Sequence, residues 1–157
     1  MEPLTITTIA INCPITEVYK FVINMENFKL WFPEVMDIKS DDQRTHGVVG
    51  KKYLETVRLP FKGVQKISLT VVQSEDNKLF ITEGMFLPLL PRMVVKFTED
   101  AHKITSLTWS MHSRNDSFIF KTLFLPFIQK VIEKRATVGL QNLKKILESN
   151  NDRLLKN

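Results

Sequence analysis

Residues 34–113 mostly alternate apolar and polar side chains, whereas the apolar residues that follow recur at helical spacing. Alternation over short runs is typical of strands buried on one face, and apolar residues three and four apart are typical of an amphipathic helix. The β-branched run at residues 4–12 predicts the first strand. Six further strands are predicted at residues 34–41, 50–59, 64–75, 78–86, 92–99 and 103–113, with turn residues between them.

Two short helices are predicted between the first and second strands. Pro14 suits the first turn of a helix that ends at Asn24. Asn24 can also cap a second short helix, whose aromatic residues face inward before Pro33 stops it. The last long helix is predicted from Ser117 to about Glu148, and residues 149–157 are predicted to be a frayed tail.

Two residues interrupt the pattern of the long helix. Pro126 lacks an amide proton, so the helix should kink or restart near Leu125. Gly139 costs about 1 kcal/mol relative to alanine in a helix interior. Close approach of the helix to the sheet explains Gly139 best, with room for a bound guest as the alternative.

This order of elements predicts an α+β fold. A curved seven-stranded antiparallel sheet should wrap around the long C-terminal helix, with the two short helices plugging one end. A helix lying in the concave face of such a sheet does not fill it completely. We therefore expect a cavity between them.

Composition limits the class of protein. The 157 residues are enough for a single domain with its own core, and Cys13 is the only cysteine, which favours a buried thiol in a reducing, cytoplasmic setting. The 22 basic and 17 acidic residues give a net charge of +5 but form no basic stripe, so we do not expect nucleic-acid binding. The apolar run at residues 118–132 is short and interrupted by lysines and a proline, so stable membrane insertion is not expected.

The segment MFLPLLPRM, residues 85–93, is unusually apolar for a loop. Pro88 and Pro91 cannot both lie inside a paired strand. Its leucines and phenylalanine therefore need a cover. Three alternatives remain open: a gate over a cavity, packing under the long helix, or an interface, which leaves a homodimer possible.

Several local motifs appear in a characteristic order. They are Asn12, Cys13 and Pro14 followed by the helix TEVYKFV; the segment NMENFKLWFPEVMDIK with Trp31 and Pro33; Val49 and Gly50 before the third strand; TSLTWSM at residues 105–111; and GLQNLKKILE near the end. In this order the chain resembles the START-like (SRPBCC) superfamily with the helix-grip fold, and within it the small bacterial polyketide cyclase/dehydrase-like group. The resemblance implies one helix-grip domain over residues 1–148.

The resemblance also implies a function. We expect binding of a hydrophobic or amphipathic small molecule, lipid-like or polyketide-like, between the sheet and the C-terminal helix. The alternatives are a polyketide cyclase, aromatase or dehydratase, and a protein-interaction adaptor that uses residues 85–93. No cofactor is implied.

The candidate ligand-binding residues are apolar and come from four segments of the chain. They are Trp31, Met85, Phe86, Leu87, Leu90, Trp109, Met111, Phe124, Ile128, Val131 and Ile132. Strand alternation puts Trp109 and Met111 on the face toward the helix, where ordinary core packing is the better explanation for both.

Candidate catalytic residues are few: Glu83, Arg58 and Tyr53. Parity could turn Glu83 inward, whereas Glu55 and Arg58 should point to opposite faces of their strand. Solvent exposure is the commoner state for both glutamates. His46, His102 and His112 show no paired spacing, so surface positions and no metal site are expected.

Overall fold

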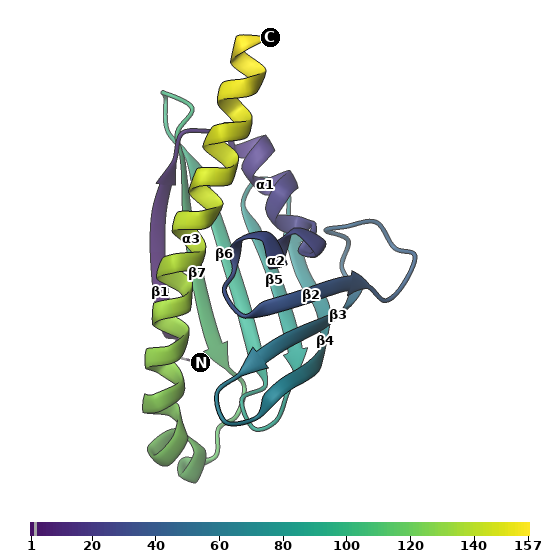
Figure 1. The fold of residues 1–157 in the computed structure, drawn as a ribbon, viewed down its shortest axis with the longest axis vertical. Coiled ribbons are helices and arrows are strands. Elements are labelled where there is room, and N and C mark those ends of the chain that lie inside the picture. Colours follow the sequence, from purple (N-terminus) through teal and green to yellow (C-terminus); the bar gives the residue numbers. More distant parts are fainter. Residues whose placement is uncertain (2) are drawn as a thin grey trace.

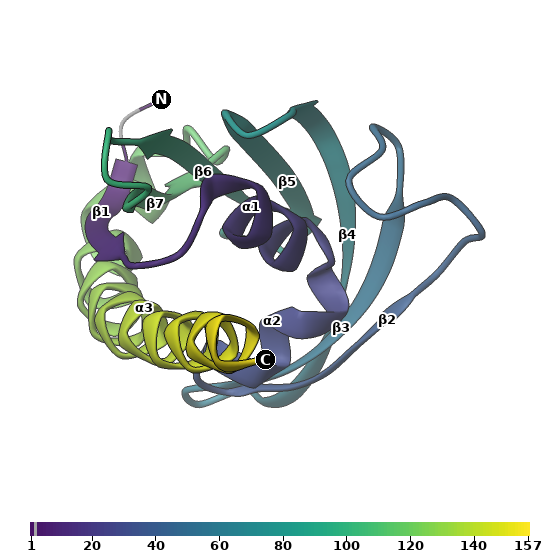
Figure 2. The same ribbon diagram turned by 90° about the horizontal axis from the view of Figure 1, so that it is seen from above.

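One long helix lies in the concave face of a strongly curved sheet in the computed structural model, which describes Met1 and residues 3–157. The strands are β1 (Pro3–Ile11), β2 (Val35–Ser40), β3 (Lys52–Leu59), β4 (Gly63–Glu75), β5 (Leu79–Met85), β6 (Pro91–Glu99) and β7 (Thr105–Ser113). They form one antiparallel sheet in the order β1-β7-β6-β5-β4-β3-β2. Figure 2 shows the sheet curling around the helix.

The helices also follow the predicted order. They are α1 (Ile15–Ile23), the 3₁₀ turn η1 (Met25–Asn27), α2 (Phe28–Trp31), the π-helical turn η2 (Phe120–Phe124) and α3 (Leu125–Lys156). Figure 1 shows α3 running the length of the molecule, with α1 and α2 at one end of the sheet. The α+β helix-grip layout predicted from the pattern is confirmed.

Local sequence signals explain several helix boundaries. The Asn24 side chain accepts a hydrogen bond from the Glu26 amide at 3.1 Å, which confirms Asn24 as a cap. The α-helix restarts at Leu125 with Pro126 in its first turn, because a prolyl residue there removes no helical hydrogen bond. Residues 149–156, predicted to be a frayed tail, are helical instead, and the Asn151 amide donates to the Asn12 carbonyl at 3.1 Å.

The core lies between α3, the short helices and the concave face of the sheet. Trp31 and Trp109 are 2% and 0% exposed, and the Trp109 ring packs 5.2 Å from that of Phe32. A Cβ atom on Gly139 would lie 3.0 Å from the Phe32 side chain. Gly139 therefore allows close packing as predicted, but against the end of α2 rather than against the sheet.

Within the described residues, no helix combines the length and apolar character needed to cross a membrane.

Candidate functional site

A small chamber lies between the sheet and the first half of α3. It encloses about 120 Å³ and its walls come from η1, α2, β2–β7 and α3. Its lining is apolar except for Glu55, Thr82 and Arg135. The other lining residues are Met25, Phe28, Phe32, Val35, Val57, Leu59, Ile67, Leu69, Gly84, Phe86, Leu89, Pro91, Met93, Met111 and Ile132.

A wider vestibule of about 470 Å³ adjoins this chamber on the outside. It lies between the β3–β4 turn, the β5–β6 loop and the start of α3. Both hollows share five lining residues: Leu59, Phe86, Leu89, Ile132 and Arg135. These side chains therefore lie at the boundary between the two hollows, which we call the connection, and a molecule entering the chamber from solvent would have to pass between them.

Gly84 lets neighbouring side chains pack closely against β5 in the chamber wall. A Cβ atom at this position would lie 2.8 Å from the Pro91 side chain and 3.2 Å from that of Leu69. Any larger residue would have to displace these neighbours, because such separations are well inside van der Waals contact. Glycine is therefore needed where β5 turns its inner face toward the guest space.

Glu55 is the one acidic residue in the chamber wall. It is 7% exposed and has no hydrogen-bond partner among the described residues. Burial raises the pKa of Glu55 to about 7, although the positive charge of Arg135 opposes the rise. The expectation that Glu55 faces solvent is wrong. The alternation of Tyr53, Glu55 and Val57, all on the inner face of β3, was the signal that could have placed it.

Arg135 stands at the connection between chamber and vestibule. Its guanidinium donates a hydrogen bond to the Arg58 carbonyl at 3.2 Å. Burial lowers the pKa of Arg135, against the opposing charges of Glu34 and Glu55. No ion pair joins Arg135 to Glu55 within the described part of the chain, so both groups remain available to a polar guest.

Two of the predicted catalytic residues lie outside the hollow. Glu83 alternates with Thr82 and Gly84, which line the chamber, so its side chain points to the outer face of β5. There it pairs with Arg92 and with Arg114, the latter at 3.3 Å. Arg58 is exposed, on the opposite face from Glu55 as predicted. The suggestion that Glu83 turns inward is therefore wrong.

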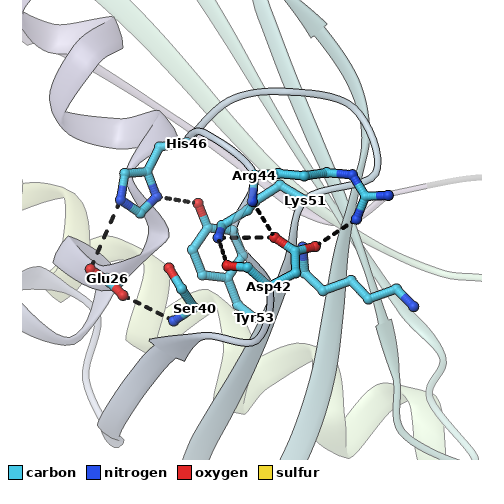
Figure 3. Close-up of polar contacts among 8 residues, drawn as sticks. Glu26, Ser40, Asp42, Arg44, His46, Lys51 and Tyr53 are labelled. Atoms are coloured by element: carbon cyan, nitrogen blue, oxygen red, sulfur yellow. Dashed lines mark hydrogen bonds and ion pairs between the residues drawn. The ribbon is translucent and has the colours of Figure 1, made fainter.

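Tyr53, the third candidate, is fully buried and belongs to a separate polar cluster, shown in Figure 3. Its hydroxyl and the His46 Nδ1 atom are 2.7 Å apart and share a hydrogen bond, and the two rings stack. Burial raises the pKa of Tyr53 to about 12. His46 is thus partly buried and bonded rather than a plain surface residue.

Lys51 is the other buried charge of this cluster. It is 1% exposed, and its ammonium group lies 3.1 Å from the Asp42 carboxylate and donates to the Asp42 carbonyl at 2.7 Å. Burial disfavours the charge on Asp42, but hydrogen bonds from Lys51, Arg44 and Lys52 outweigh burial and hold the pKa of Asp42 well below its usual range. Neither Lys51 nor Asp42 could be predicted as a site residue, because loop residues 41–51 carry no sequence pattern that pairs them.

The predicted ligand-binding residues divide into those that line a hollow, those in the core and those in neither place. Phe86, Met111 and Ile132 line the chamber, and Phe86, Phe124, Ile128, Val131 and Ile132 line the vestibule. Trp31 and Trp109 pack in the core instead, where the Phe32 ring lies 5.8 Å from the Trp31 ring and 5.2 Å from the Trp109 ring. Met85, Leu87 and Leu90 line neither hollow.

Residues 85–93 are held in place on one side. The Asn115 amide donates to the Pro88 carbonyl at 2.7 Å, and the Ser113 hydroxyl donates to the Leu89 carbonyl at 2.6 Å. Phe86 and Leu89 turn toward the hollow, whereas Leu87 is 71% exposed. The loop therefore covers the connection with two side chains and presents a third to the outside.

A further groove, of about 510 Å³, lies at the other end of the molecule, between α1, η1 and the last turns of α3. Its lining includes Glu17, Lys20, Asn24, Asn150 and other polar residues. Cys13 borders it but is buried, and burial raises the pKa of its thiol to about 11, so it is a poor nucleophile. The mixed, solvated lining makes this groove less suited to an apolar guest than the chamber.

Comparison with known proteins shows which family the chain resembles. Residues 5–148 match the family model described as polyketide cyclase / dehydrase and lipid transport. No curated protein matches the chain in sequence.

Solved structures share the fold at low sequence identity. A protein of Thermus thermophilus superposes with a TM-score of 0.73 at 12% identity, covering 93% of this chain and 97% of the other. The di-domain ARO/CYC StfQ from the steffimycin biosynthetic pathway gives a TM-score of 0.69 at 10% identity, covering 94% of this chain and 51% of StfQ. A Staphylococcus aureus protein of unknown function gives 0.66 at 12% identity, covering 94% and 96%.

Proposed function

The chain belongs to the polyketide cyclase/dehydrase and lipid transport family, and from that premise we propose that it binds a hydrophobic or amphipathic small molecule between the sheet and α3. The observation that carries the proposal is the apolar chamber joined to the vestibule through shared side chains. An apolar cavity of about 150 Å³ is enough to hold benzene. The chamber is of that order, so a larger guest would extend into the vestibule.

The polar groups favour one orientation of the guest. Near neutral pH Glu55 is partly protonated, so it can donate or accept a hydrogen bond, and Arg135 can donate. A buried polar group without a partner costs about 1–3 kcal/mol, which a carbonyl or hydroxyl of the guest would offset. We therefore place the polar end of the guest between Glu55 and Arg135, with its apolar body along Phe86, Ile128 and Ile132.

Binding can be tested with a fluorescent amphipathic probe, anilinonaphthalene sulfonate, and with native mass spectrometry of the purified protein. Ile132→Trp places a large ring in the connection and should weaken probe binding by about tenfold or more. Val138→Trp is the matched control, because Val138 lies on the same helix but is 44% exposed and lines neither hollow. Equal binding by both variants, or no saturable site, would contradict the proposal.

An enzymatic function is the second candidate, and Glu55 is the observation that favours it. A carboxyl with a pKa of about 7 can act as a general acid or base, and a nearby guanidinium can stabilise a developing enolate. In a cyclase or dehydratase reaction Glu55 would remove a proton next to a ketone while Arg135 held the ketone oxygen. The chemistry would follow that implied by the name of StfQ.

Glu55→Gln separates the two functions. Glutamine keeps the size and the hydrogen-bonding capacity of the side chain but cannot take up a proton. A binding protein should hold the probe within a few-fold of wild type after this change. An enzyme should lose turnover of a poly-β-ketone analogue by about a hundredfold or more, because general acid–base catalysis contributes that much.

A further inference from the structure

The mouth of the vestibule is surrounded by apolar side chains that nothing covers. We define the mouth surface as the exposed large apolar residues of the β3–β4 turn, the β5–β6 loop, η2 with its preceding turn, and the start of α3. They are Phe61, Leu87, Phe118, Ile119, Leu123, Phe124 and Phe127. Figure 1 shows these segments at its lower end, opposite the C-terminus.

The exposure is extreme for side chains of this size. Phe61 is 96% exposed and Phe118 is 81% exposed. The Phe61 and Phe127 ring centroids are 5.8 Å apart, so the β3–β4 turn and the start of α3 form one continuous surface. Contiguous apolar surface of this kind marks an interaction site, whereas isolated exposed residues do not.

The charge at this end is distinctly basic. Residues 58–66, 85–93 and 114–130 together carry seven Lys and Arg but one Asp, a net charge of +6, whereas the whole chain carries +5. The remainder of the chain is therefore close to neutral, at −1. Arg92 and Arg114 are engaged by Glu83, but Lys62, Lys66 and Lys130 form no ion pair within the described residues.

We propose that the mouth surface docks reversibly on an anionic lipid bilayer. Phenylalanine and leucine side chains flanked by lysines suit the boundary between acyl chains and headgroups, since the rings enter the apolar layer while the ammonium groups meet lipid phosphates. A second copy of the chain fits less well. Two mouth surfaces placed face to face would bring like charges together.

Docking would place the vestibule against the bilayer. Phe61, Phe124 and Phe127 belong to both the mouth surface and the vestibule lining. An apolar molecule could then move between the bilayer and the vestibule without crossing water. The docking itself does not require a bound guest, so it goes beyond the proposed function and can fail or succeed independently of it.

The experiment is co-sedimentation of the full chain with vesicles. One set contains phosphatidylcholine alone, and the other contains phosphatidylcholine with about a third phosphatidylglycerol. Wild-type protein should bind the anionic vesicles at least about tenfold more strongly, and raising the salt concentration should weaken this binding.

Two variants test the two parts of the surface. Phe61→Ser combined with Phe118→Ser should lower binding to anionic vesicles by about tenfold or more. Lys62→Gln combined with Lys130→Gln should weaken binding to anionic vesicles and leave the weak binding to neutral ones unchanged. All four positions are exposed, so folding should be retained, and thermal unfolding of each variant checks this.

Matched controls lie at the other end of the molecule. Val49→Ser with Leu155→Ser removes two exposed apolar side chains, and Lys145→Gln with Lys156→Gln removes two exposed charges. Neither control should change vesicle binding. The proposal would be overturned if controls and mouth variants lost vesicle binding equally, or if the wild-type protein bound neither vesicle type. It would also be overturned by a concentration-dependent dimer that the Phe61 and Phe118 changes abolish. Phe118→Ser alone, at a position that lines neither hollow, should weaken vesicle binding and leave probe binding unchanged, which separates docking from guest binding.

Discussion

Two ionisable side chains are buried at β3, and they are treated in opposite ways. Lys51, just before the strand, is 1% exposed and is matched by a carboxylate, a carbonyl and the ring of Tyr53, whose centroid lies 5.3 Å from the ammonium group. Glu55, within the strand, is 7% exposed and faces the chamber without a hydrogen-bond partner among the described residues.

This difference indicates a structural role for Lys51 and a ligand-related role for Glu55. A buried charge that is fully paired is costly to unpair, and Figure 3 shows Lys51 paired with Asp42 of the loop, residues 41–51, that leads into β3. A buried carboxyl without a partner destabilises the fold unless a guest supplies the missing bond. The stabilising partners of Lys51 lie within the chain, whereas those of Glu55 would come from outside.

The largest expected effect on stability comes from removing the paired charge of Lys51. Lys51→Met should lower the free energy of unfolding by about 3 kcal/mol, because the Asp42 carboxylate then loses its main counter-charge. Urea denaturation measures this loss. The exposed Lys52 provides the control, since Lys52→Met removes the same charge from a solvated position and should have little effect. If the two variants were equally stable, Lys51 would not be a structural charge.

The unpaired Glu55 carboxyl should make the free energy of unfolding depend on pH. The pKa of Glu55 rises from 4.5 in the unfolded chain to about 7 in the folded one, so the folded state holds a proton that the unfolded state has released. The contribution of Glu55 is therefore most favourable below pH 4.5 and is lost as the pH rises through about 7. The shift corresponds to roughly 3 kcal/mol.

Glu55→Gln removes this dependence. Wild type and variant should have similar unfolding free energies near pH 4.5, and the variant should be the more stable by up to about 3 kcal/mol at pH 8. Denaturation curves across this range provide the measurement. A constant difference between the two proteins at all pH values would show that Glu55 does not titrate in the chamber.

The smallest effect is expected at Tyr53, which lies between Lys51 and Glu55 along the chain. Tyr53→Phe removes the hydroxyl that pairs with His46, at 2.7 Å, and keeps the buried ring. The loss should be about 1 kcal/mol, typical of one hydrogen bond, with no change in probe binding, because Tyr53 does not line the chamber. Thermal unfolding and probe titration check both parts. A change in probe affinity would mean that the polar cluster and the chamber are coupled.

Much of the architecture could be predicted, because each element carries its own periodicity. Alternation located the seven strands, Asn24 and Pro126 marked helix boundaries, and the mixture of strands with one long helix indicated the hollow. The tail was the exception. Residues 149–156 are mostly polar, but they continue a helix whose Asn151 reaches Asn12, a contact that no local pattern encodes.

The polar residues of the site were harder to assign. Alternation along a strand indicates which residues share a face but not which face is buried, so it cannot distinguish Glu83 from Glu55. The register of β5 against β4 and β6 turned Glu83 outward to Arg92 and Arg114, while the curl of β3 beneath α3 enclosed Glu55. The order of elements and the apolar character of the hollow follow from local spacing, so they can be read from the chain alone. Which charge lies in the chamber and which side chains surround its mouth depends on the fold, because burial is set by segments that are distant in sequence and meet in space.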